Sequence, residues 1–167
     1  MVKLLLFVLV VGFSFGITEE EFRKDREYLK RVEKRLDEID RVIQRRGARA
    51  SEIDELNSYG YPLNKLRDKY MRESEAKYED FSLKISKVYD RVLFVKRGAF
   101  PSLLREEIES LQVPICSVRA EGSRRETITI VMEDPEDEED VLKVMTETQL
   151  RYAHLLGIEN VRFEKCR

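Results

Sequence analysis

Residues 18–46, TEEEFRKDREYLKRVEKRLDEIDRVIQRR, determine how the first half of the chain folds. Apolar side chains recur at steps of three and four from Leu29 to Ile43, and charged side chains fill most of the positions between them. So narrow an apolar stripe predicts an amphipathic helix of coiled-coil type. Thr18 suits the N-cap of this helix and Gly47 suits its C-cap.

A second amphipathic helix is predicted over residues 62–97, ending at Gly98. Its apolar stripe settles into the same alternation after one irregular step near its start, and residues 47–61 connect the two helices. Two narrow stripes with a connector predict an antiparallel helical hairpin of coiled-coil type over residues 17–98. The same stripes suit self-association through the helices. The alternative is one ordinary surface stripe per helix on a globular core.

Residues 99–167 have the pattern of a small α+β domain. The order is a short helix, two strands, a helix and a strand, over residues 100–111, 113–118, 127–132, 134–156 and 161–163. This αββαβ order predicts a sandwich with its helices on one face of the sheet.

The run from Val92 to Val95 leaves a second topology open. It is strongly β-prone, and as a strand it would complete the βαββαβ order of a ferredoxin-like fold. The sustained three–four alternation around it favours a helix instead, which leaves a three-stranded sheet.

The two cysteines predict a disulfide. Cys116 lies near the start of the first strand and Cys166 near the end of the last. In an oxidising compartment such a pair is expected to bridge. We expect the bridge if these strands are neighbours, so it competes with the ferredoxin-like order, in which they form opposite edges. The alternative is two unpaired thiols.

Residues 1–16, MVKLLLFVLVVGFSFG, have the plan of an export signal. Lys3 precedes an unbroken apolar run, and small residues stand before a possible cleavage site at Ile17. The alternative is an uncleaved anchor, although the apolar segment is shorter than the roughly 20 residues that span a membrane. The sequence therefore predicts an exported protein, periplasmic or extracellular, or anchored at the membrane facing outward. Membrane contact is expected only if residues 1–16 stay attached.

Composition narrows the function classes. Charged residues make up 38% of the chain, yet the formal net charge is only −2, which argues against a nucleic-acid-binding surface. The abundance of Glu, Lys and Arg resembles that of heat-adapted proteins. The one histidine, His154, has no second ligand or nucleophile beside it, so we predict no catalytic, metal or cofactor site.

Two arginine clusters are the candidate partner-binding positions. They are expected at the hairpin tip and at the β-turn, and comprise Arg45, Arg46, Arg49, Arg119, Arg124 and Arg125. Such clusters can dock an acidic partner or lipid headgroups, and solvated loop charge is the alternative.

The leading hypothesis is a non-enzymatic envelope interaction or scaffold protein, in which the hairpin reaches or bundles and the α+β domain docks. Its partner is expected to be another protein or a second copy. A periplasmic holdase-like chaperone and a small ligand-binding or enzymatic α+β domain are the alternatives.

Overall fold

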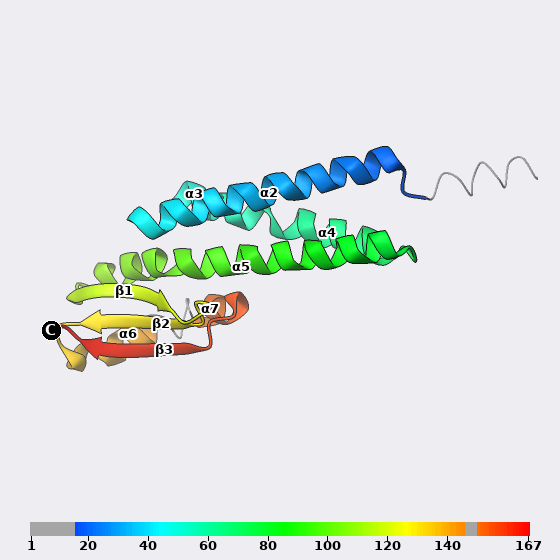
Figure 1. Cartoon of the computed structure of the whole chain (residues 1–167). Coiled ribbons are helices and arrows are strands. Elements are labelled where there is room, and N and C mark those ends of the chain that lie inside the picture. Colours follow the sequence, from blue (N-terminus) through cyan, green and yellow to red (C-terminus); the bar gives the residue numbers. More distant parts are fainter. Residues whose placement is uncertain (1–15, 146–149) are drawn as a thin grey trace, which may run out of the picture.

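The computed structural model describes residues 16–145 and 150–167. They form a helical arm and a small sheet domain that lies beside one end of the arm (Figure 1). The predicted α+β class is confirmed. All but the last residue of the predicted export signal lies outside the described residues.

The arm consists of three helical segments, and each segment runs antiparallel to the one before it in the chain. Its helices are α2 (Glu19–Arg46), α3 (Ala50–Ser58), α4 (Gly60–Met71) and α5 (Ala76–Ser110). Ion pairs from α2 to α5 keep the same order along both helices, from Glu19–Lys77 to Asp37–Arg91, so α2 and α5 run parallel. The helices α3 and α4 return in the opposite direction (Figure 1).

The predicted two-helix hairpin is therefore wrong, because it has one reversal of chain direction and the arm has two. The chain reverses once more at residues 72–75, inside the predicted second helix, where no glycine or proline marks a break. The irregular step in the apolar stripe was the sequence signal of this reversal. Burial explains it, because Tyr70 and Tyr78, on either side of the reversal, both pack onto Phe22 of α2.

The ends of α2 follow the sequence closely. The hydroxyl of Thr18 accepts a hydrogen bond from the N–H of Glu21 at 3.1 Å, and Gly47 takes the positive φ of a helix C-cap. All apolar members of the predicted stripe are buried, which places the stripe against α4 and α5.

Helix α5 begins and ends later than the predicted second helix. It continues through Gly98 and Pro101 to Ser110, so the predicted helix end at Gly98 is wrong and the predicted boundary between the two parts falls within one helix. Pro101 donates no backbone hydrogen bond, but its ring is buried between the arm and the sheet domain. Val92 to Val95 is helical, as the alternation favours, so the ferredoxin-like order does not form.

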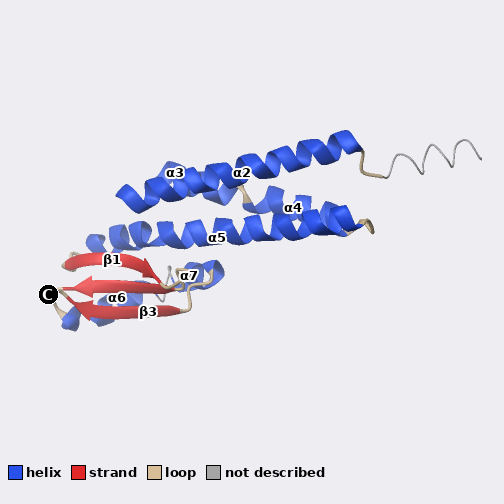
Figure 2. Ribbon diagram, in the orientation of Figure 1, coloured by secondary structure: helices blue, strands red, loops and turns tan. Residues whose placement is uncertain are grey.

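The sheet has three strands in the order β1-β2-β3, and Figure 2 shows them beside the end of α5. Strand β2 (Thr127–Met132) pairs antiparallel with β1 (Ile115–Glu121) and parallel with β3 (Asn160–Lys165). The buried side chains of β2 pack onto Phe100, Leu104 and others from the end of α5. The predicted helix over residues 134–156 is present as η1 (Pro135–Asp137), α6 (Glu138–Val144) and α7 (Leu150–Leu156), with residues 146–149 outside the described part.

The cysteine pair meets by a different route from the predicted one. Strand β2 separates β1 from β3, so the cysteine-bearing strands are not neighbours. Cys116 and Cys166 nevertheless lie at bonding distance, with their Cα atoms 6.2 Å apart. Cys116 occupies a register shift in β1, and the N–H of Cys166 donates to the carbonyl of Met132, the last residue of β2. The bridge thus crosses the end of the central strand.

Candidate functional site

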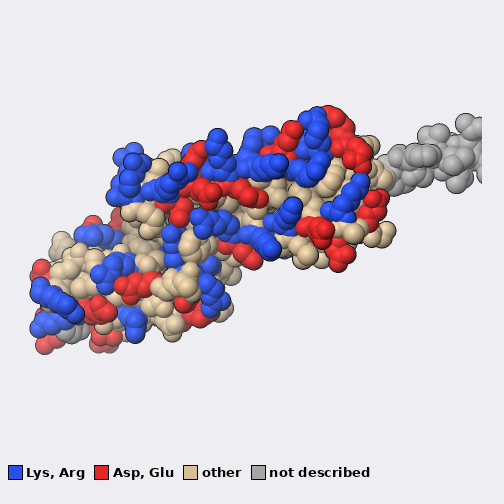
Figure 3. Space-filling view, viewed as in Figure 1, with Lys and Arg blue, Asp and Glu red and all other residues tan. Residues whose placement is uncertain are grey.

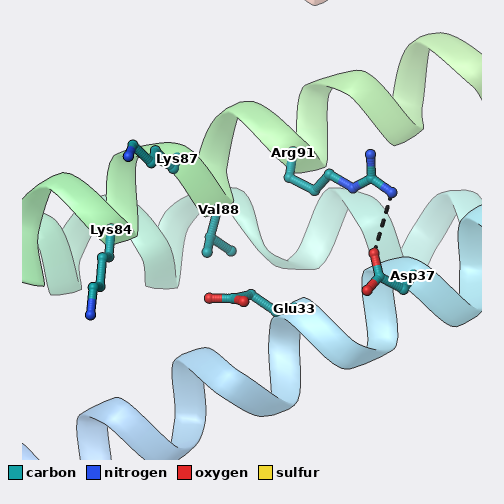
Figure 4. A pocket seen from close by; sticks show the side chains of 6 residues that line it. All are labelled: Glu33, Asp37, Lys84, Lys87, Val88 and Arg91. Carbon is teal, nitrogen blue, oxygen red and sulfur yellow. Dashed lines mark hydrogen bonds and ion pairs between the residues drawn. The ribbon is translucent and has the colours of Figure 1, made fainter.

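A furrow runs along the seam between the parallel helices α2 and α5. Its middle section encloses about 300 Å³ and is drawn in Figure 4; it is lined by Glu33, Asp37, Lys84, Lys87, Val88 and Arg91. Buried Val88 supplies an apolar wall, and the ion pair between Arg91 and Asp37, 3.2 Å long, closes one end. Lys84 also lines a second hollow of about 430 Å³ toward the start of α2.

The two sides of the furrow carry opposite charge in its middle section. Carboxylates line the α2 side of this section and cationic side chains the α5 side, within an arm surface on which both signs are mixed (Figure 3). In the hollow toward the start of α2, each side carries both signs, with Arg26 on α2 and Asp80 on α5. Among the described residues, Glu33, Lys84 and Lys87 have no ion-pair partner within 4.0 Å. These three charges are therefore available to a partner that lies along the seam.

The first predicted arginine cluster lies where α2 ends and α3 begins. Arg46 forms an ion pair with Glu52, whose carboxylate also accepts a hydrogen bond of 2.6 Å from the N–H of Arg49. Burial raises the pKa of Glu52, but the contacts with Arg49 and Arg46 outweigh it and hold that pKa below its ordinary value. Arg45 and the side chain of Arg49 remain exposed.

The second predicted cluster divides between surface and interior. Arg119 lies on the uncovered face of the sheet, 3.1 Å from Glu121, and exposed Arg124 lies 3.4 Å from Glu159. Arg125 turns inward instead, and its guanidinium meets Asp40 of α2 at 2.6 Å. The structure does not bring the two clusters together into one basic patch.

Arg125 is the centre of the joint between the sheet domain and the arm. Its guanidinium stacks over the ring of Phe94 at 4.0 Å from the centroid, and only 14% of the side chain is exposed. Arg97 of α5 adds a second tie, because its guanidinium donates to the carbonyls of Arg124 and Leu156, both at 2.7 Å. The residues joined by each of these contacts are far apart in the sequence, so local sequence patterns do not predict the joint.

Gly98 is the position at which α5 makes room for Arg125. A Cβ atom added there would lie 2.5 Å from Nη1 of Arg125. We expect Gly98→Ala to lower the free energy of unfolding by about 1–2 kcal/mol, because the guanidinium is held in place and cannot yield. In an Arg125→Ala background the same change should raise it by about 1 kcal/mol, since alanine is the better helix former. Urea unfolding of the four proteins measures this, and equal signs in both backgrounds would contradict it.

Other chemical features of the described residues are modest. Burial lowers the pKa of the Lys96 ammonium, which lines a small hollow with Leu56 and Tyr152. His154 is exposed on α7. Within residues 16–145 and 150–167 there is no group of three or more His, Cys, Asp and Glu placed to hold a metal ion. No helix in that part of the chain has the length and apolar character to cross a membrane.

Comparison with known proteins finds a relative that is similar over nearly the whole chain. The chain is 27% identical, over 161 residues, to an uncharacterized protein of Aquifex aeolicus (strain VF5), and the match covers 95% of this chain and 96% of that protein. No protein-family model matches the sequence. No solved structure matches it either. The similarity extends over both the arm and the sheet domain.

Proposed function

We propose that the protein is an exported, non-enzymatic interaction or scaffold protein in which the arm holds the sheet domain away from the start of the chain. One observation carries this proposal: the described chain begins at the end of the arm opposite the sheet domain (Figure 1). The sheet domain contacts α2 at Asp40, which lies 21 residues after Glu19, so at 1.5 Å per residue the start of α2 is about 32 Å from that contact.

The joint supports a role as a rigid spacer. Asp40, Phe94 and Arg97 fix the β-turn and α7 to the arm, and α5 contributes side chains to both apolar cores. A continuous helix shared by two cores resists hinge motion, so the sheet domain keeps one orientation relative to the arm.

The cysteine pair supports export. A bridge that ties down the end of the chain persists in oxidising compartments and is rare where thiols are kept reduced. The middle section of the furrow supports an interaction role, because a partner helix laid in it would meet the apolar side chain of Val88 between two rims of opposite charge.

The test is affinity capture of the tagged full chain from an envelope fraction, followed by intact-mass measurement with and without reductant. We expect a specific partner to be recovered, and to be lost on Lys84→Glu/Lys87→Glu, because the change reverses the basic rim of the furrow. The matched control is Lys30→Glu/Lys34→Glu, which makes the same charge change on exposed positions of α2 and should keep the partner.

Three results would count against the proposal. The first is recovery of no partner by any of the three proteins. The second is an intact mass that shows reduced thiols and an uncleaved start in a cytoplasmic fraction. The third is suppression of client aggregation at stoichiometric amounts, which would favour the holdase-like alternative.

A further inference from the structure

Strand β3 is an edge strand. It pairs with β2 on one side, and on its other side no strand of the described residues lies against it (Figure 2). Arg162 and Glu164 are exposed on the face of the sheet that the helices leave uncovered, while Val161 and Phe163 are half-buried toward the helices. An edge of this kind presents a row of backbone N–H and C=O groups to a further strand.

The backbone groups that face outward can be assigned from the hydrogen bonds at the ends of β3. The N–H of Asn160 donates to Glu126, and the N–H of Cys166 donates to Met132, so the even-numbered residues point their backbone groups toward β2. Alternation along the strand then points those of Val161, Phe163 and Lys165 outward.

We propose that β3 pairs antiparallel with β3 of a second copy, across a two-fold axis at Phe163, to give one continuous six-stranded sheet. Phe163 would exchange both backbone hydrogen bonds with its counterpart, and Val161 would do so with Lys165 of the second copy. The inference deepens the proposed function by naming a second copy as a partner, and it does not depend on export.

Charge selects this register. The outward backbone groups of Val161, Phe163 and Lys165 can pair across a two-fold axis placed at Arg162, at Phe163 or at Glu164. Each of these positions gives at least two hydrogen-bonded residue pairs between the copies. With the axis at Arg162, two arginines would face each other, and with the axis at Glu164, two carboxylates would do so. With the axis at Phe163, Arg162 of each copy faces Glu164 of the other, in non-hydrogen-bonded pairs, where side chains are closest.

The local surroundings are compatible with these pairs. Arg162 has no ion-pair partner among the described residues, and Glu164 lies 3.7 Å from Arg119 in a contact that leaves 51% of its side chain exposed. Glu164 would therefore lie between two guanidinium groups in the dimer. The two arms would point in opposite directions, because they run alongside the strands and the axis is normal to the sheet (Figure 1).

Analytical ultracentrifugation of the full, oxidised chain tests the inference. We expect a concentration-dependent dimer, and we expect Arg162→Glu to raise its dissociation constant about tenfold or more, because it sets two pairs of like charges opposite each other. The charge swap Arg162→Glu/Glu164→Arg restores unlike pairs and should return the constant to within about threefold of the original.

A backbone variant tests the edge itself. Lys165→Pro removes an outward N–H that β2 does not use, so it should abolish the dimer while leaving the thermal unfolding of the monomer nearly unchanged. Lys165→Ala is its matched control and should dimerise. A wild-type chain that stays monomeric at high concentration, or a dimer unaffected by Lys165→Pro and by Arg162→Glu, would overturn the inference. Lys84→Glu/Lys87→Glu should dimerise normally, so failure here is separable from failure of the furrow test.

Discussion

Loss of the bridge between Cys116 and Cys166 is expected to lower the free energy of unfolding by about 2–4 kcal/mol. The two cysteines are 50 residues apart, so the bridge removes many conformations from the unfolded chain. It also fastens the end of β3 across the end of β2, where otherwise only the last few backbone hydrogen bonds hold the terminus. Urea unfolding of the oxidised protein, with and without reductant, measures the loss.

The serine variants provide the control for this prediction. Cys116→Ser, Cys166→Ser and the double variant should be equally unstable, because either single change breaks the same bridge. Reductant should then have no effect on the double variant. A wild-type midpoint that does not move with reductant, or a double variant that does move, would contradict the prediction.

Asp40→Ala is expected to cost about 2–4 kcal/mol of unfolding free energy. The carboxylate of Asp40, 13% exposed, neutralises the guanidinium of Arg125 inside the joint. Its removal would leave that guanidinium desolvated against Phe94 with one backbone acceptor at 3.4 Å. An uncompensated charge in such a site is strongly destabilising, whereas the intact pair itself contributes little net stability. Thermal or urea unfolding measures the change.

Asp37→Ala is the matched control for Asp40→Ala. Both aspartates lie on α2 and both approach Arg91, but the Asp37 side chain is 58% exposed. Its ion pair is screened by water, so we expect a loss of less than about 1 kcal/mol. Asp40→Ala/Arg125→Ala should be less destabilised than the sum of its single changes, because no charge is then left buried. Equal losses for the two aspartate variants would show that the joint does not depend on this pair.

Several features could be predicted because they depend on neighbours in the sequence. The stripe from Leu29 to Ile43 and the N-cap at Thr18 specify α2 by themselves. The β-branched run over residues 127–132 specifies β2. The cysteine pair was predicted from its number and setting, although the route by which the two residues meet was not.

Other features depended on partners far along the chain. The reversal at residues 72–75 carries no turn residues, and it forms because aromatic side chains on both sides of it reach Phe22. The continuation of α5 past Gly98 follows from burial of Phe100 and Leu104 in the sheet core, which outweighs the local preference to stop.

The candidate surfaces also depend on contacts between segments that are far apart in the sequence. Arg125 looks like loop charge in the sequence, and only the position of Asp40, 85 residues away, makes it part of a joint. The furrow lies between α2 and α5, which are adjacent and parallel because the chain reverses once more at residues 72–75. The sequence by itself determined helix α2, the strands and the balance of charge, since these follow from local periodicity and composition. Only the tertiary structure decided which charges are buried, which rims face each other and which strand edge is open, because those depend on distances between segments that local patterns do not encode.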